Sequence, residues 1–310
     1  MHSTTKTTDT RSLRIALATN AAFSLTCATL MILRPSLVGD WLGISAPLVL
    51  RAIGIGLFLF AADLIHQATR HRITTWRALY ASTADFLWVA GTFVLLALFP
   101  NALSQTGITL VVSVAIVIFV FAIWQLWAIG RAHKLLDSGL YRHCILVEVN
   151  ARADAMWHVI ARIGDIKHYM PSLKHSTILH GKTPGVGAVR MCEDRSGKRW
   201  AEECIDFKPG HSFDVRFLSE APDFPFPMKT MHGGWKVIPT DGGSQVMVWW
   251  ELEPKQRFLV PIILPLLAFQ ADRDFPKIVQ RMAADAVTRD PAAVDPRNPG
   301  VITRLLPNFC

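Results

Sequence analysis

Four long apolar stretches occupy the first part of the chain, at residues 13–33, 46–65, 78–99 and 107–129. Each is about 20 residues or longer, and at a helical rise of about 1.5 Å per residue this matches a hydrocarbon layer about 30 Å thick. After residue 130 the apolar runs shorten and charged residues return. The pattern predicts a polar tail (residues 1–12), four transmembrane helices (residues 13–130) and a linker (residues 131–142) before a water-soluble domain.

The soluble region has the alternating apolar positions and turn residues of an α+β domain. A strand is predicted over residues 143–150, a helix over 153–163 and a second short helix over 165–173. Pro-Gly, Ser-Gly and Asp-Gly-Gly turns help to delimit six antiparallel strands, at residues 176–181, 187–194, 199–207, 212–219, 232–238 and 245–253. A long helix over residues 262–286 closes the domain, and residues 288–310 are expected to form an extended tail.

Composition and charge agree with a chain that lies partly in lipid. Hydrophobic residues make up 51% and charged residues only 18%, below the roughly 25% of soluble proteins. Basic residues gather before the first apolar stretch, between the second and third, and after the fourth. The positive-inside rule therefore predicts an inner (plasma) membrane protein with its N-terminus and soluble domain in the cytoplasm. The sequence has no basic helix with interleaved aromatic residues, so no nucleic-acid partner is expected.

Four polar side chains fall within the predicted spans, all in the third nearest the cytoplasm: Asn20, Asp63, Asp85 and Gln125. Polar groups are costly in a bilayer, so their presence needs a reason. One interpretation is an intramembrane cluster that faces the bundle interior, near the path of a ligand. The alternative, which we favour, is hydrogen bonding between helices, with Asp63 reaching the membrane surface.

Three segments of the soluble region carry a family resemblance: residues 155–157 (AMW), 165–172 (DIKHYMPS) and 186–213 (VGAVRMCEDRSGKRWAEECIDFKPGHSF). They resemble the SRPBCC superfamily, the group of polyketide cyclase/dehydrase and START-like domains, over roughly residues 143–287. The resemblance implies a helix-grip fold, in which a curved antiparallel sheet surrounds the C-terminal helix and encloses a deep, mostly apolar cavity. It does not imply one activity, because lipid carriers and aromatase/cyclases share the fold.

The hairpin formed by residues 189–204 contains the main candidate for chemistry. A two-residue Ser-Gly turn would place Arg190 opposite Glu203 and Met191 opposite Glu202. The more apolar face, expected to point inward, then consists of Val189, Met191, Trp200, Glu202 and Cys204. An inward Glu202 could serve as a general acid or anchor a ligand hydroxyl, whereas the alternative is a structural ion pair or hydrogen bond with another lining side chain. A shift of one residue would exchange the two faces.

Aromatic residues are dense in the predicted domain, and some are expected to line its cavity. The predicted ligand-binding residues are Trp157, Tyr169, Met191, Trp200, Glu202, Phe217, Trp235 and Trp250. An apolar cavity with a few polar groups suits a hydrophobic ligand. The alternative for most of the rings is ordinary core packing.

Two apolar segments are expected to form the rim of the cavity. Residues 258–269 are too short to span a bilayer and contain Pro261 and Pro265, while residues 221–228 are rich in proline and phenylalanine. We predict that this rim contacts the inner leaflet through Phe224, Phe226, Phe258, Leu259 and Ile262. Burial of these side chains against the sheet is the alternative.

Several other chemistries find no support in the sequence. The histidines lack metal-ligand spacing, no C-x-x-C or G-x-S-x-G motif occurs, and Gly-Lys-Thr at residues 181–183 lacks the first glycine of a P-loop. Neither a metal nor another cofactor is therefore expected. The sequence favours a membrane-tethered, non-enzymatic binding or transfer protein for a lipid, sterol-like compound, quinone or polyketide. Alternatives are a membrane-bound polyketide or isoprenoid cyclase using Glu202, with His232 or Tyr169, as acid/base groups, and a scaffold protein.

Overall fold

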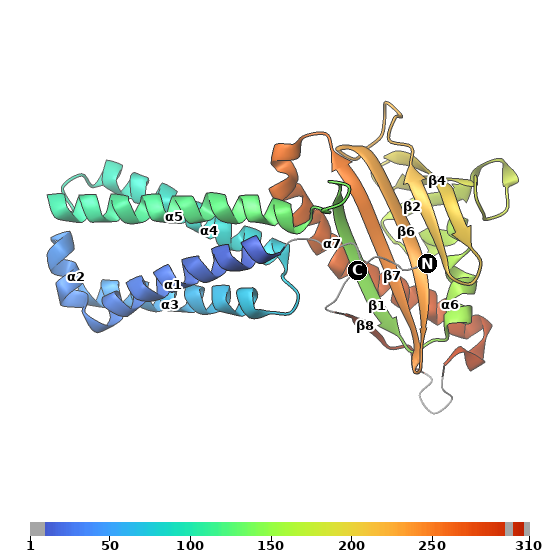
Figure 1. Cartoon of the computed structure of the whole chain (residues 1–310), viewed down its shortest axis with the longest axis horizontal. Helices are drawn as coiled ribbons and strands as arrows, with labels where there is room; N and C mark the ends of the chain where they lie inside the picture. Colours follow the sequence, from blue (N-terminus) through green and yellow to red (C-terminus); the bar gives the residue numbers. More distant parts are fainter. Residues whose placement is uncertain (1–9, 295–299, 307–310) are drawn as a thin grey trace. The chain divides into compact units, whose positions relative to one another are not determined.

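The computed structural model describes residues 10–294 and 300–306 (Figure 1). The chain divides into two compact units. One comprises Thr8–His133 together with Pro261–Leu266, and the other comprises the remaining chain, chiefly Lys134–Val260 and Leu267–Cys310.

The first unit is helical. Its helices are α1 (Arg11–Leu33), α2 (Pro35–Leu42), α3 (Pro47–Thr69), α4 (Thr75–Leu98) and α5 (Gln105–Ala132). All except α2 are long and apolar enough to cross a membrane, so the four predicted apolar helices are confirmed. The short α2 was not predicted; Pro35 begins it, and Gly43, with a φ of 76°, ends it in the left-handed conformation.

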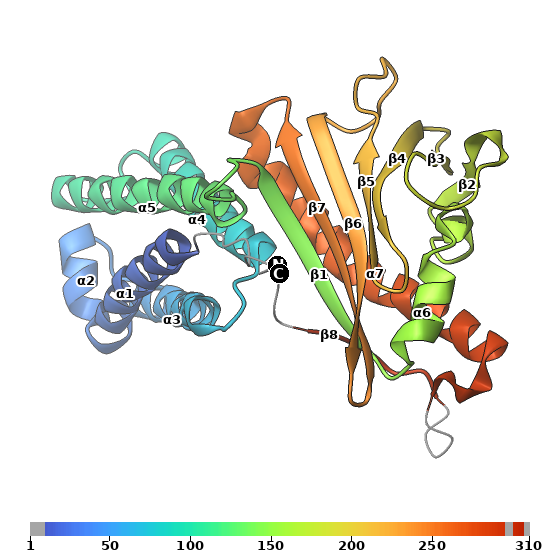
Figure 2. The same ribbon diagram turned by 45° about the vertical axis from the view of Figure 1, so that its right-hand side comes forward.

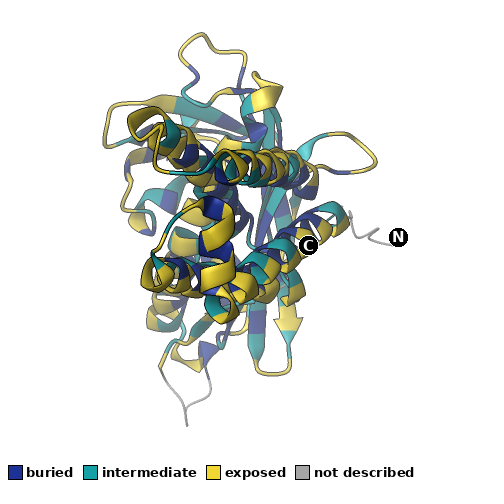
Figure 3. Cartoon of the chain, turned by 90° about the vertical axis from the view of Figure 1, so that its left-hand side faces the viewer, coloured by how far each residue is buried: buried dark blue, intermediate teal, exposed yellow. Residues whose placement is uncertain are grey.

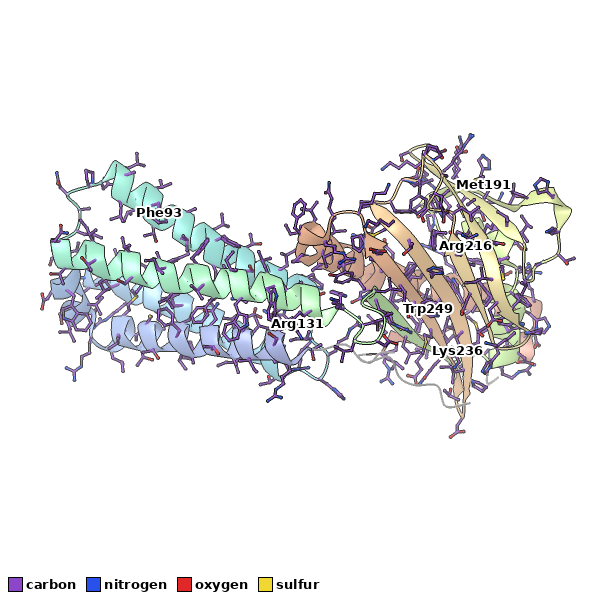
Figure 4. All side chains as sticks on the ribbon, turned by 45° about the horizontal axis from the view of Figure 1, so that its top comes forward. Phe93, Arg131, Met191, Arg216, Lys236 and Trp249 are labelled. Atoms are coloured by element: carbon purple, nitrogen blue, oxygen red, sulfur yellow. The ribbon has the colours of Figure 1, made fainter. Side chains whose placement is uncertain are left out.

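Small residues allow the helices to approach closely. A Cβ atom on Gly54 of α3 would lie 2.9 Å from side-chain atoms of Met31 and Ile32 on α1. Figure 3 shows buried and exposed positions mixed along each helix. The exposed ones include large apolar side chains such as Leu48 (77% exposed) and Phe93, labelled in Figure 4. This combination of small interior and large apolar exterior residues is typical of helices packed in lipid.

The second unit is an antiparallel sheet around a long helix (Figure 2). Its strands are β1 (Tyr141–Val149), β2 (Leu173–Ile178), β3 (Val189–Asp194), β4 (Arg199–Lys208), β5 (Ser212–Phe217), β6 (Met228–Thr240), β7 (Gly243–Pro254) and β8 (Thr303–Leu305), in the order β2-β3-β4-β5-β6-β7-β1-β8. The helices are α6 (Ala153–Ile160), the 3₁₀ helix η1 (Ile163–His168) and, apart from the segment Pro261–Leu266, α7 (Val260–Arg289). This arrangement is the predicted helix-grip fold.

Aromatic side chains fill the space between the sheet and α7. Phe275 of α7 lies with its ring centre 5.9 Å from that of Trp235 on β6 and 4.8 Å from that of Trp250 on β7. Phe213 on β5, which pairs with Trp235, is fully buried, and so is Met156 in the segment after β1. These contacts show how alternate positions of the central strands face the helix.

Three predicted elements differ from the structure. The second short helix is a 3₁₀ turn that ends at His168, and β2 starts at Leu173, before the predicted strand. The tail is not simply extended: a short 3₁₀ helix (Pro291–Ala293) follows α7, and β8 pairs with β1. The period of the apolar residues does not show where a turn ends a helix. It also does not show that the tail pairs with the edge of β1.

Candidate functional site

The turn of the β3–β4 hairpin sets the register of the site. Asp194 donates its backbone N–H to the carbonyl of Lys198 (2.9 Å), so three residues, not two, lie between the paired positions. Its Oδ1 accepts hydrogen bonds from the N–H groups of Ser196 (2.8 Å) and Lys198 (2.9 Å), and Gly197 takes a φ of 85°. This three-residue turn with a left-handed glycine makes the predicted two-residue turn wrong.

The register is consequently shifted by one residue from the predicted one. Arg190 lies opposite Glu202, and Met191 lies opposite Ala201. Arg190 and Glu202 are both buried, so Glu202 does lie on the inner side of the hairpin. Met191, labelled in Figure 4, lies on the other face and is half-buried. The expected pairing of Arg190 with Glu203 is wrong, and so is the placing of Met191 beside Glu202.

Glu202 is the centre of a buried hydrogen-bonded network. Arg190 donates from Nη2 to Oε2 of Glu202, and Trp200 donates from Nε1 to Oε1 at 2.7 Å. Only 8% of the Arg190 side chain and 5% of the Glu202 side chain are exposed. Although burial acts to lower it, the carboxylate of Glu202 raises the pKa of Arg190. Both oxygens of Glu202 are therefore engaged as acceptors, the arrangement expected for a structural ion pair.

Two buried thiols flank this network. Burial raises the pKa of Cys192 to about 12 and that of Cys204 to about 11. A cysteine acts as a nucleophile through its thiolate, and a raised pKa keeps these groups as thiols at neutral pH. Neither cysteine has the environment of a catalytic nucleophile.

A small pocket lies beside Arg190, between the sheet, the α6–η1 segment and α7. Its lining is mostly apolar: Val159, Ile160, Ile163, Ile166, Phe213, Trp235 and Met282, with Arg162, Tyr169 and Arg190 as polar members. The free volume is about 10 Å³, enough for one water molecule, so this pocket is far smaller than the deep cavity that the family resemblance implies. The Nε–H groups of Arg162 and Arg190 are buried and have no hydrogen-bond partner among the described residues. The pocket thus combines apolar walls with two arginines that each keep one unused donor.

Polar contacts join η1 to α7 at this pocket. Tyr169 donates its hydroxyl to Oδ2 of Asp285 (2.6 Å), and Arg162 donates to the same oxygen (2.7 Å). Burial and the hydrogen bond to Asp285 raise the pKa of Tyr169. Burial acts to raise the pKa of Asp285, but hydrogen bonds from Tyr169, Arg289 and Arg162 outweigh it and hold the pKa below its usual value.

Residues 146–287 match the family described as "Polyketide cyclase / dehydrase and lipid transport". The match covers most of the sheet domain. It is the SRPBCC domain that the sequence resembles.

Solved structures similar to the SRPBCC domain include plant and bacterial proteins. Norcoclaurine synthase from Thalictrum flavum is 17% identical, with 48% of this chain and 97% of that chain covered and a TM-score of 0.39. The ZhuI aromatase/cyclase from Streptomyces sp. R1128 is 18% identical, with 50% and 98% covered and a TM-score of 0.39. Ara h 8.0201 is 16% identical, with 47% and 99% covered and a TM-score of 0.38. No curated protein sequence matches this chain significantly.

The predicted ligand-binding residues of the SRPBCC domain are distributed over several places. Tyr169 and Trp235 line the pocket beside Arg190. Trp157 packs against Phe207 on β4, with ring centres 5.5 Å apart, and Trp250 packs against α7 as described above. Trp157 is buried among core rings, and the ligand-binding role of all these residues stays a prediction.

Trp200 and Phe217 belong to a second aromatic group, together with the β5–β6 loop. Phe226 lies with its ring centre 5.4 Å from Trp200, 6.3 Å from Phe217 and 5.3 Å from Phe224. Phe224 is only 8% exposed, so for this residue the structure agrees with the alternative, burial, and not with the predicted contact with the inner leaflet. The rings bury each other, because a cluster removes more apolar surface from water than separate exposed side chains would. Phe258 (76% exposed) and Ile262 (44%) remain outward, and Leu259 is half-buried.

The four polar residues of the helical unit separate into two groups. Asn20, Asp85 and Gln125 are buried together: Asp85 Oδ2 accepts from Asn20 Nδ2 (2.8 Å) and Gln125 Nε2 (2.9 Å). Asp63 instead forms an ion pair with Arg77 of α4 and accepts a hydrogen bond from Gln67 (2.5 Å). The helices are thus linked by polar side chains.

Three residues of the site were not predicted as site residues. Arg190 was placed on the outer face because the register was off by one. Arg162 and Asp285 are brought together from positions 123 residues apart, and no local pattern reports such a contact. A basic residue in an otherwise apolar strand face was the one signal in the sequence that could have indicated Arg190.

Proposed function

We propose that this chain is a membrane-anchored protein whose SRPBCC domain binds a hydrophobic small molecule, such as a lipid, a sterol-like compound, a quinone or a polyketide. The observation that carries the proposal is the pocket beside Arg190. Apolar walls with a few convergent polar groups are typical of small-molecule sites. Burial of apolar ligand surface contributes about 25 cal/mol per Å², and a ligand oxygen would satisfy the unused donor of Arg190.

Binding requires the pocket to enlarge. Ligand pockets usually have about 300–1,000 Å³, far more than the space for one water molecule beside Arg190. The contacts of Asp285 with Tyr169 and Arg162 hold η1 to α7 at this place. We therefore expect a ligand to select a conformation in which these contacts are broken, at a cost that lowers its apparent affinity.

The membrane would supply both the anchor and the ligand. In this proposal α1, α3, α4 and α5 span the inner membrane with both termini in the cytoplasm, and Phe258, Leu259 and Ile262 touch the inner leaflet. Exposed apolar groups of this kind favour the interface between lipid and water. Tethering raises the effective concentration of the SRPBCC domain near a lipid-soluble ligand.

A cyclase-type enzyme is the second candidate, and Arg190 is the observation that favours it. A buried arginine with a free N–H group can stabilise negative charge that develops on a substrate oxygen. Glu202 is a poorer candidate for acid/base catalysis in this arrangement, because Arg190 and Trp200 occupy both of its oxygens. Turnover of a polyketide or isoprenoid substrate would favour this candidate.

The test is the small-molecule content of the purified full-length protein. Mass spectrometry of an organic extract should find a hydrophobic compound in about stoichiometric amount. The double variant Arg190→Met/Glu202→Leu, which removes the donors without leaving a buried charge, should lose most of it. Arg216→Met is the matched control, since Arg216 pairs with Glu203 on the other face of the hairpin. Absence of any compound in the wild type, together with no change in tryptophan emission on adding hydrophobic ligands, would refute the proposal.

A further inference from the structure

The buried carboxyl group of Asp85 joins three helices. Asp85 lies on α4 with only 4% of its surface exposed. One of its oxygens, Oδ2, accepts two hydrogen bonds, one from Asn20 on α1 and one from Gln125 on α5. Ser24 extends the group by donating to Oδ1 of Asn20 at 3.2 Å. The cluster therefore holds α1, α4 and α5 together through one carboxyl group.

Two groups of this cluster lack a partner among the described residues: an amide oxygen lacks a hydrogen-bond donor, and a carboxylate lacks a cation. Oε1 of Gln125 is buried and has no hydrogen-bond partner among the described residues. Within the same residues, no cationic side chain forms an ion pair or hydrogen bond with Asp85. An unpaired carboxylate and an unpaired amide oxygen are each costly away from water, and more so in lipid.

The charged and titratable groups on the neighbouring helices are placed elsewhere. They are Arg11, Arg14 and Cys27 on α1, Arg51, Asp63 and His66 on α3, Arg77 and Tyr80 on α4, and Arg131 on α5, with His133 just after it. Arg77 is paired with Asp63, Arg14 donates to the carbonyl groups at the end of α3, and His133 bonds the hydroxyl of Thr75. Asp63 thus has a cationic partner, and Asp85 has two neutral amides.

One proton on Asp85 would remove both deficits. On Oδ1 it neutralises the carboxylate and provides a donor for Oε1 of Gln125, which closes a pair of hydrogen bonds between a carboxyl and an amide group. A metal ion fits less well, because hard cations take about six or more oxygen ligands and only these two oxygens are unused. We propose that the α1–α4–α5 cluster is a proton-binding site within the membrane, with Asp85 as its carboxylic acid.

The site would couple the packing of the bundle to pH. Release of the proton to water leaves a carboxylate among apolar helices and removes the donor to Gln125, so α4 should be held less firmly by α1 and α5. This inference assumes that the four helices lie in a bilayer. It does not depend on what the SRPBCC domain binds.

The decisive variant is Asp85→Asn, studied as full-length protein in lipid nanodiscs. Asparagine mimics the neutral acid: its oxygen can accept from Asn20 and Gln125, and its NH₂ group can donate to Oε1 of Gln125. We expect the wild type to unfold at lower temperature as the pH is raised into the alkaline range. Asp85→Asn should keep the unfolding temperature of the acidic wild type and lose this pH dependence.

Asp63→Asn is the matched control on α3. It leaves Arg77 without its anion, so it should lower the unfolding temperature at every pH and retain the pH dependence. The proposal is overturned if Asp85→Asn is destabilised as much as Asp63→Asn, or if added sodium, potassium or magnesium raises the unfolding temperature of the wild type but not of Asp85→Asn.

Infrared spectroscopy tests the same proton without relying on the fold of Asp85→Asn. Protein labelled with carbon-13 at aspartate carboxyl groups should show a carbonyl band of a protonated acid at neutral pH. The band should persist in Asp63→Asn. Its absence from both the wild type and Asp63→Asn would show an ionised Asp85 and end the proposal.

Discussion

Arg190 and Glu202 form a buried ion pair, so substitution of one residue affects the other. Both are buried, and Arg190 also donates from Nη1 to the carbonyl of Ile163 at 2.6 Å. The network therefore ties the β3–β4 hairpin to η1. We expect this network to specify the conformation of the hairpin as much as to stabilise it, since desolvation offsets much of the attraction in a buried ion pair.

Substitution of Glu202 alone should destabilise the protein far more than substitution of both Arg190 and Glu202. Glu202→Leu leaves the guanidinium of Arg190 buried without an anion and should lower the free energy of unfolding by about 3–5 kcal/mol. The double variant Arg190→Met/Glu202→Leu should regain most of this loss. Urea denaturation followed by tryptophan fluorescence measures both. Glu203→Gln, which breaks only the more exposed pair with Arg216, should cost about 0–1 kcal/mol. An equal loss of unfolding free energy in the single and double variants would contradict this account of the ion pair.

Gly234 marks a place on β6 where no side chain fits. A Cβ atom there would lie 2.5 Å from Oδ1 of Asp214 and 2.6 Å from Nε1 of Trp249. Gly234→Ala should therefore destabilise the protein by about 1–3 kcal/mol, as overpacked sites do. Gly242→Ala, at a position with nothing within 4 Å, is the control and should change thermal stability little. Unchanged stability of Gly234→Ala would show that Trp249 can move aside.

At the scale of elements, the link between η1 and α7 depends on one carboxylate. Asp285 accepts from Tyr169 and Arg162, and Arg289, one turn further along α7, donates to it at 3.0 Å. Two of its partners, Arg162 and Tyr169, also line the pocket beside Arg190. Stability and access of a ligand are therefore expected to oppose each other here.

The pH dependence of this link has a defined sign. The pKa of Asp285 is lower in the folded protein than in the unfolded chain, so its stabilisation is present above the unfolded value of about 3.9 and is lost as the pH falls through the folded value. Asp285→Asn should lower the free energy of unfolding at neutral pH by about 2 kcal/mol. The difference from the wild type should shrink in acid. A difference that stays constant with pH would assign the effect to packing.

The β3–β4 hairpin illustrates what the sequence can and cannot predict about an element. Alternation predicted both strands and the inner position of Glu202. The partner of Glu202 depended on the turn. Asp194 pairs with Lys198 and Gly197 takes a positive φ, so the loop has three residues and not two. A Ser-Gly pair is compatible with either loop length, so the register, and with it the role of Arg190, required the structure.

At the scale of the whole molecule, the four apolar helices and the helix-grip fold were predictable, because hydrophobic length and strand alternation are local properties. The size of the pocket was not. It depends on how side chains such as Phe213 and Met282 fill the space between sheet and helix, and on contacts between residues distant in the chain. The sequence drew attention to the polar residues of the four apolar helices, but their division into two hydrogen-bonded groups depends on which helices touch.

Topology in the membrane is open to direct measurement. If the N-terminus is cytoplasmic, the α3–α4 loop at Arg70 is also cytoplasmic, whereas the α4–α5 loop at Asn101 is on the other side. Single cysteines at these two positions, in a background lacking the native ones, should differ in labelling of intact cells by a reagent that cannot cross the inner membrane. Only the cysteine at position 101 should react. Labelling at position 70 alone would reverse the orientation.

The short strand β8 carries a practical consequence. It pairs with the last three residues of β1, and Arg304 reinforces the pairing through Glu148 at 2.6 Å. A sheet edge left bare invites other chains to add to it. A protein shortened to end before Thr303 is therefore expected to self-associate into aggregates. Experiments that divide or label this chain should leave β8 in place.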